Sequence, residues 1–134
     1  LPISFAVTAG VGAAELAARF TAERDDYSAI LVQALADRLA EAFAELLHQR
    51  ARRDWGYGAA ESFTPAELID EKFRGIRPAF GYPACPDLEG NRTLLDLLEG
   101  STLGVELTET FQMVPEFTTT ALVLHHPQAR YFAV

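Results

Sequence analysis

Residues 26–53 read DYSAILVQALADRLAEAFAELLHQRARR, and this stretch predicts one long helix. Asp25 or Asp26 stands at its start as a capping residue. The last turn is basic, as the helix dipole favours, with Arg50, Arg52 and Arg53. Large apolar residues keep helical spacing and predict the stripe through which the helix packs. The stripe consists of Tyr27, Leu31, Leu35, Leu39, Ala42, Phe43, Leu46 and Leu47.

Shorter elements are predicted on both sides of this helix. The apolar start at 3–7 indicates a strand that ends at Gly10 and Gly12, and residues 13–24 follow as a helix. The turn at 55–60 ends the long helix. Thr64 to Glu67 form a capping box with proline at the first helical position, which predicts a short helix to about Phe73. A further helix is expected over 94–98, opened by Asn91 or Thr93 and closed by Gly100.

The remainder of the chain has the composition of strands. Residues 105–113 and 116–125 are rich in threonine and β-branched residues. A turn at 126–128 precedes a last strand at 130–134. Adjacent strands with short turns predict an antiparallel meander, so the expected fold class is α+β with helices packed on one face of the sheet.

Composition bounds the classes of function. The 134 residues suffice for one domain, and 49% hydrophobic residues suffice for a core. A net charge of −8 argues against nucleic acid or an anionic membrane as partner, and no apolar run is long enough to span a bilayer. The chain begins without methionine, which suggests a fragment or a processed piece. A single cysteine, Cys85, provides no disulfide framework and fits a reduced, cytoplasmic setting.

The most distinctive motif is the loop at 77–86, Arg-Pro-Ala-Phe-Gly-Tyr-Pro-Ala-Cys-Pro. Three prolines exclude a helix interior or a central strand, and Gly81 permits a backbone conformation that other residues avoid. The stiff loop therefore presents one fixed cation, Arg77, and one aromatic ring with a polar tip, Tyr82. Such a loop suits recognition of a small polar ligand, although a proline-rich connector is the alternative interpretation.

This loop resembles the signature of the activation domain of cobalamin-dependent methionine synthase, from which it departs only at Phe80, where the family has proline. The resemblance continues in order along nearly the whole chain. It includes Asp26 to Ile30, the helical run 33–45, Trp55-Gly56-Tyr57, Glu67-Leu68-Ile69, Leu107-Thr108-Glu109 and the closing segment from His126-Pro127 to Tyr131. The whole of 1–134 is thus expected to be one such domain, shorter than its relatives at both ends.

The resemblance implies a binding site for S-adenosylmethionine (AdoMet). Arg77 falls on the family position that meets the ligand's carboxylate, for which a guanidinium offers a forked contact. Glu41 and Glu71 fall on acidic positions near the sulfonium, a fixed cation. The remaining implied site residues are Ala79, Gly81, Tyr82 and Tyr131. Taken alone, Glu41 would be a solvated helix residue and Tyr131 a half-buried strand residue.

The resemblance also implies the reaction and its partners. AdoMet would supply the methyl group for reductive remethylation of cob(II)alamin, in a methyltransferase of methionine biosynthesis. A flavodoxin-like protein would supply the electron. The family's motif for the lower cobalt ligand, Asp-x-His-x-x-Gly, does not occur in the sequence. Cobalamin would therefore be presented by a cobalamin-binding domain or another chain, and this domain would contribute positioning with no catalytic residue of its own.

The residues leave three other interpretations to consider: a metal site, a nucleophilic cysteine and a different function. His125 and His126 are adjacent and would point to opposite faces of a strand, while His48 lies on a distant helix, so no metal site is expected. Cys85 fits a structural thiol better than a nucleophile. The alternative function is a non-catalytic, stand-alone relative that binds a partner protein or another adenosyl ligand.

Overall fold

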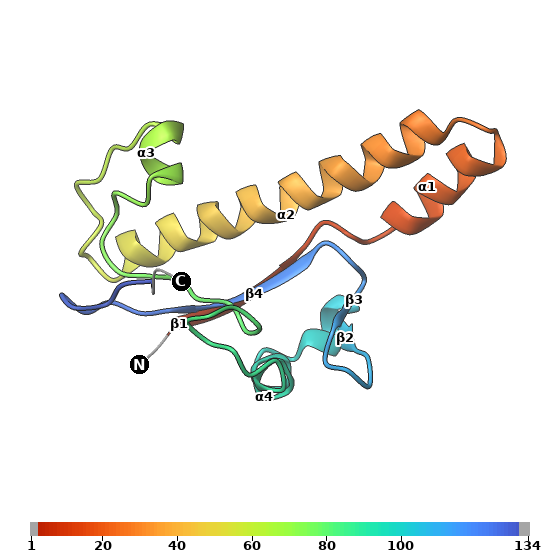
Figure 1. Ribbon diagram of the computed structural model, residues 1–134. Coiled ribbons are helices and arrows are strands. Elements are labelled where there is room, and N and C mark those ends of the chain that lie inside the picture. The colour runs from red at the N-terminus through yellow and green to blue at the C-terminus, as the bar shows by residue number, and fades with distance from the viewer. Residues whose placement is uncertain (1–2, 132–134) are drawn as a thin grey trace.

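The computed structural model describes residues 3–131. Its main sheet pairs β1 (Ile3–Thr8) with β4 (Thr118–Val123) in antiparallel register, so that Ile3 lies opposite Val123 and Thr8 opposite Thr118. The first strand of the chain therefore pairs with the last, as Figure 1 shows. Phe5 and Val7 on β1 and Ala121 and Val123 on β4 are buried together in one apolar cluster.

The long helix forms as expected and lies along one face of this sheet. α2 (Asp26–Asp54) begins after Asp25, whose carboxylate accepts a hydrogen bond from the backbone N–H of Ser28 at 3.0 Å. α1 (Ala13–Ala22) precedes it and folds back along it (Figure 1). The cluster between sheet and helix includes Ala44 and Ala51, with Leu47 packed against it. This arrangement confirms the α+β class with one long helix.

The predicted packing stripe of α2 was wrong for every member except Leu47. Tyr27 is 77% exposed and Leu39 is 60% exposed, and the other members also lie on the surface. Alanines form the buried face instead, at Ala29, Ala36, Ala40, Ala44 and Ala51. The small side chains let the backbone of α2 come close to the sheet and to α1. The interior is therefore close-packed without large side chains from this face of the helix.

The C-terminal strands do not form the expected meander. β2 (Glu106–Leu107) and β3 (Met113–Val114) are short and pair with each other in a separate ribbon, joined by a turn in which Thr108 N–H donates to the carbonyl of Gln112 at 2.9 Å. Among residues 3–131, only β4, within the predicted strand 116–125, joins β1. Residues 130–131 belong to no strand, and the rest of the expected last strand lies outside the described residues.

Two further helices complete the fold. α3 (Pro65–Ile69) starts at the expected capping box, with Glu67 and Thr64 bonded to each other. α4 (Gly90–Leu97) starts and ends earlier than predicted, and the residues after it, Gly100–Leu103, form a 3₁₀ turn, η1. α4 lies on the sheet face opposite α2, where Asn91 accepts a 2.7 Å hydrogen bond from the buried Thr120 of β4. Helices thus cover both faces of the sheet, and the expectation of one covered face is corrected.

The segment before the proline-rich loop extends the sheet. Ile76 and Leu124 exchange two backbone hydrogen bonds of 2.9 Å, and Leu122 N–H donates to the carbonyl of Pro78 at 3.0 Å. The chain at 76–78 therefore lies along the edge of β4 that faces away from β1. Backbone bonds of this kind fix the position of Arg77, which lies between the two attached residues.

Candidate functional site

A cavity of about 360 Å³ opens between the proline-rich loop, α2, the end of α3 and β4. Six of the seven site residues expected from the sequence line it: Glu41, Glu71, Arg77, Ala79, Tyr82 and Tyr131. These residues span 90 positions of the chain, and the fold brings them together. The volume lies in the usual range for small-molecule sites, about 300–1,000 Å³.

Arg77 is the cation of the cavity, and two carboxylates of α2 hold its side chain. Its Nη2 atom lies 3.4 Å from Oε2 of Glu45 and 3.8 Å from Oε2 of Glu41. The Arg77 side chain is 22% exposed, so the guanidinium is largely desolvated yet reaches the cavity. Among the described residues, its Nε and Nη1 atoms have no hydrogen-bond partner within the protein. A planar guanidinium held by one nitrogen can offer the others to a carboxylate ligand.

Tyr131 crosses over to the loop from the far end of the chain. Its hydroxyl accepts a 2.7 Å hydrogen bond from the backbone N–H of Arg77. Burial raises the pKa of this phenol, and the bond from Arg77 partly opposes the rise. Tyr131 therefore stays protonated at neutral pH, and its hydroxyl proton can still donate to a ligand.

Glu71 reaches the cavity because α3 ends just before it. Its N–H bonds to the carbonyl of Leu68, and the N–H of Lys72 bonds to the carbonyl of Glu67, which together form a Schellman motif. Glu71 takes the left-handed position of that motif, with φ of 54°, where glycine is the usual residue. Glu71 therefore occupies a position at which the backbone conformation alone would favour glycine.

The tip of the loop is a tight turn. Gly81 N–H donates to the carbonyl of Cys85 at 2.9 Å, and Cys85 N–H donates to the carbonyl of Tyr82 at 2.8 Å. Gly81 has φ of 91° and, unlike the other six expected residues, does not line the cavity; its role is to permit the turn. The ring of Phe80 packs against Gly90 at the start of α4, in the space that a Cβ at Gly90 would need.

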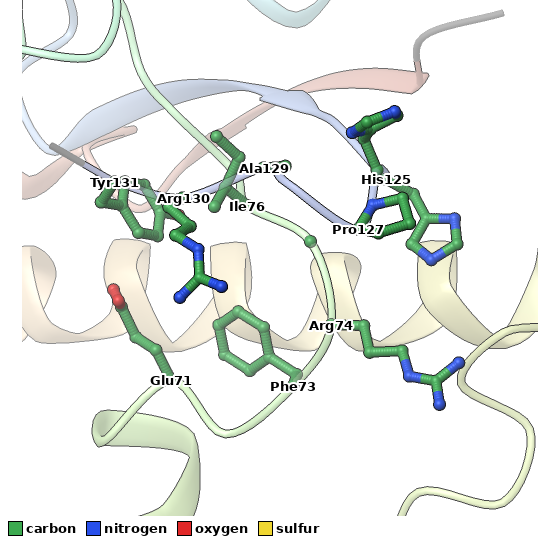
Figure 2. Close-up of a pocket in the computed structure, with 11 residues that line it drawn as sticks. Glu71, Phe73, Arg74, Ile76, His125, Pro127, Ala129, Arg130 and Tyr131 are labelled. Atoms are coloured by element: carbon green, nitrogen blue, oxygen red, sulfur yellow. The ribbon is translucent and has the colours of Figure 1, made fainter.

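A second cavity of about 650 Å³ adjoins the first and shares Glu71 and Tyr131 with it. Figure 2 shows it continuing from these two residues past Phe73 and Arg130 toward Arg74 and His125. Its basic side chains and single carboxylate distinguish it from the first cavity. The ring of His125 is stacked on that of Tyr57, with 3.7 Å between centroids.

α2 also carries a polar stripe, exposed at Glu41 and buried at His48 and Arg52, which its sequence pattern did not predict. Glu41, Glu45, His48 and Arg52 recur at helical spacing and lie about a quarter turn away from the alanine face. His48 and Arg52 are both fully buried, and both contact Phe73: His48 edge-on at 4.8 Å and Arg52 over the ring at 4.3 Å. The spacing of these polar residues was visible in the sequence, but four charged or polar residues on a helix usually mark a solvated face. Thr119, which also lines the cavity, carried no signal.

The other sequence-level candidates gain no chemical role. Burial, with the carboxylate of Asp87, raises the pKa of the Cys85 thiol, which disfavours the reactive thiolate. Across residues 3–131, no cluster of histidine, cysteine and carboxylate side chains could hold a metal ion. None of the helices in the described part of the chain has the length and apolar character needed to cross a bilayer.

The comparisons with known proteins show the family and the fold. Residues 3–134 match the model of the family described as vitamin B12 dependent methionine synthase, activation domain. The chain belongs to this family. A solved structure described as the MetH reactivation domain bound to AdoHcy is 48% identical to this activation domain, with a TM-score of 0.93. The match covers 97% of this chain and 41% of that one, so the chain spans less than half the length of its solved relative.

In this family member the loop at 77–86 and the distant Glu41, Glu71 and Tyr131 line one cavity. The solved relative contains AdoHcy, the product that remains when AdoMet gives up its methyl group. In this activation domain the cavity is lined by charges of both signs, Arg77 with Glu41 and Glu71.

Proposed function

We propose that this activation domain binds AdoMet in the cavity around Arg77 and presents its sulfonium methyl group to cobalamin. One observation carries the proposal. The fold brings six of the residues implied by the family resemblance to a single cavity, in a chain 48% identical to a reactivation domain bound to AdoHcy.

The chemistry of the cavity matches the parts of AdoMet. Arg77 supplies the fork for the α-carboxylate, and the hydroxyl of Tyr131 lies beside it at the backbone of Arg77. Glu41 and Glu71 supply negative charge for the sulfonium. The backbone of Ala79 and the ring of Tyr82 offer polar groups and an aromatic surface to the adenosine. The exposed ring of Tyr82, 64% accessible here, would become covered on binding.

The domain's contribution to methyl transfer is position. A sulfonium held at several points can meet its acceptor in an attack geometry without the entropic cost of a free encounter. Bound cobalamin would supply the metal that accepts the methyl group. The absence of Asp-x-His-x-x-Gly from the sequence supports a cobalamin carried by a separate domain or chain. A flavodoxin-like donor of the electron and a cytoplasmic setting belong to the same proposal.

Isothermal titration with AdoMet and with adenosylhomocysteine tests the binding site. We expect Arg77→Ala to weaken binding of AdoMet by about 2–4 kcal/mol, because it removes one partner of a desolvated charge pair. Arg77→Lys should recover only part of this loss, because lysine cannot make a forked contact. Equal affinities of wild type and Arg77→Ala would remove Arg77 from the site. A wild-type chain that binds neither ligand would favour the alternative, a non-catalytic interaction module.

A further inference from the structure

The side chain of Glu45 lies between two arginines, Arg77 at the cavity and the fully buried Arg52. Its Oε2 atom lies 3.4 Å from Nη2 of Arg77 at the cavity, and its Oε1 atom lies 3.9 Å from Nη1 of Arg52. Arg52 is fully buried, and its Nε atom donates to Oε2 of Glu61 at 2.7 Å. Glu45 itself is 22% exposed and does not line the cavity around Arg77.

These contacts form a chain of alternating charge: Glu61, Arg52, Glu45, Arg77 and Glu41. Arg52 is held in place, because it lies over the ring of Phe73 at 4.3 Å, donates to Glu61 through Nε at 2.7 Å and is fully buried. Glu45 therefore has the buried cation of Arg52 3.9 Å from its Oε1 atom, an ion-pair contact without a hydrogen bond, and accepts its hydrogen bond from Arg77 at Oε2. Buried charges held in this manner are costly to disturb.

We infer that Glu45 is a positioning residue, which holds the Arg77 guanidinium through Nη2 so that its remaining N–H groups face the carboxylate of the bound ligand. The inference rests on the proposed function, since it assigns Glu45 a role in that same site. An arginine fixed before binding loses less rotamer entropy when the ligand arrives. Without Glu45, Arg77 would retain its charge and lose its orientation.

The contribution of Glu45 appears only when the ligand has a carboxylate. The test compares adenosylhomocysteine, which has one, with 5′-methylthioadenosine, which shares the adenosine and thioether and lacks the amino-acid end. We expect Glu45→Gln to raise the dissociation constant for adenosylhomocysteine roughly tenfold, the size of a lost hydrogen bond to a charged group. The constant for 5′-methylthioadenosine should change less than about twofold. A general structural defect would weaken both ligands alike.

The matched control is Asp37→Asn, which removes the same charge from the same helix two turns earlier. Asp37 is 57% exposed and contacts only the neighbouring Arg38, at 3.9 Å, among its described ion pairs. It should leave the ratio of the two dissociation constants at the wild-type value. If Asp37→Asn shifts the ratio as far as Glu45→Gln does, the effect is long-range charge and the inference is wrong.

A double-mutant cycle shows whether Glu45 acts through Arg77. In an Arg77→Ala background, Glu45→Gln should produce no further change in the ratio. If it changes the ratio there by the same factor as in wild type, Glu45 acts on the ligand by another route and the inference fails. Should Glu45→Gln not fold, Glu45→Asp carries the same measurement, because it keeps the charge and withdraws it by one methylene from Arg77.

The outcomes separate the two proposals. A wild-type chain that binds no adenosyl ligand defeats the proposed function. A wild-type chain that binds adenosylhomocysteine, with a ratio unchanged in both Glu45 variants, leaves the binding function standing and overturns the role of Glu45.

Discussion

At the residue scale, Glu71 offers a direct way to separate function from stability. Its φ of 54° is unfavourable for a side chain by about 1–2 kcal/mol, and glycine would relieve this strain while adding unfolded-state entropy. Glu71→Gly should therefore keep the free energy of unfolding within about 1 kcal/mol of wild type. It should weaken AdoMet binding by roughly 0.5–2 kcal/mol, because it removes the carboxylate that we propose stabilises the sulfonium. Titration and thermal unfolding measure the two effects.

Arg24→Gly is the matched control for Glu71→Gly. Arg24 has a similar φ of 59°, in the connection between α1 and α2, and does not line the cavity. Arg24→Gly should change the free energy of unfolding by a similar amount to Glu71→Gly, and it should bind AdoMet with the affinity of wild type. If Glu71→Gly binds AdoMet as tightly as Arg24→Gly does, then Glu71 has no role at the sulfonium.

His48 provides a pH-dependent readout of the polar stripe on α2. Burial, with repulsion from Arg52 and Arg77, lowers its pKa to about 3 in the folded state. In the unfolded chain the pKa of His48 is near 6.5, so between pH 6.5 and 3 the unfolded chain binds a proton at His48 that the folded chain does not bind. The stabilisation is thus fully present above pH 6.5 and is lost as pH falls toward 3. The slope should approach about 1.4 kcal/mol per pH unit below pH 6.

Urea denaturation at several pH values between 5 and 7 measures this slope. His48→Met should flatten it, because methionine fills the space without titrating. A wild-type slope equal to that of His48→Met would mean that His48 titrates normally in the fold.

Some of the candidate site residues could be predicted from the sequence itself and others could not, for a physical reason. Arg77 and Tyr82 lie in one distinctive loop whose composition marks them, whereas Ala79 in the same loop was assigned only through the family resemblance. Glu41, Glu71 and Tyr131 were assigned only through resemblance, since each looks ordinary among its sequence neighbours. Their place at the cavity depends on contacts between residues as far apart as Arg77 and Tyr131, which no local pattern encodes.

At the scale of elements, α2 shows what periodicity predicts and what it leaves open. The long helix, its cap and the start of the short helix at the capping box were predicted from local chemistry, and the structure confirms them. The short helix ends at Ile69, earlier than the predicted end near Phe73. The buried face was wrong because the large apolar residues and the alanines both recur at helical spacing. Which of two faces packs depends on how closely the sheet approaches the helix. The strand pairing of β1 with β4 was likewise beyond a local pattern.

A pair of substitutions on α2 tests the corrected packing face. Ala44 is fully buried against the sheet, so Ala44→Leu should force the helix away and cost about 1–3 kcal/mol of stability. Ala42 was assigned to the packing stripe in the sequence analysis and is exposed in the structure. Ala42→Leu should change stability by less than about 0.5 kcal/mol. Denaturant unfolding measures both, and a reversed order would restore the face predicted from the sequence.

At the scale of the whole molecule, the site depends on how the proline-rich loop is attached to the sheet. β4 pairs with β1 on one side and with the chain at 76–78 on the other. A change in that second attachment should therefore reach Arg77 without touching the cavity. Gly75 lies at the start of the attachment, with φ of 80°, and does not line the cavity around Arg77. A Cβ there would lie 2.5 Å from the carbonyl oxygen of Leu124.

Gly75→Ala should accordingly cost more than a residue with positive φ costs alone. The carbonyl of Leu124 is the acceptor for Ile76 N–H, so the new methyl group would separate the two segments and weaken that hydrogen bond, which is worth about 1 kcal/mol.

Gly56→Ala is the matched control, because Gly56 has φ of 84° and open space around it. Both variants should lose about 1 kcal/mol from the backbone conformation. Only Gly75→Ala should lose the additional amount and also bind adenosylhomocysteine more weakly, by a factor of several, because Arg77 follows two residues later. Denaturant unfolding measures the loss of stability in the two variants, and titration with adenosylhomocysteine measures their loss of affinity. If Gly75→Ala binds the ligand as Gly56→Ala does, the loop keeps its geometry without the sheet, and the placement of Arg77 must come from α2 and Tyr131 alone.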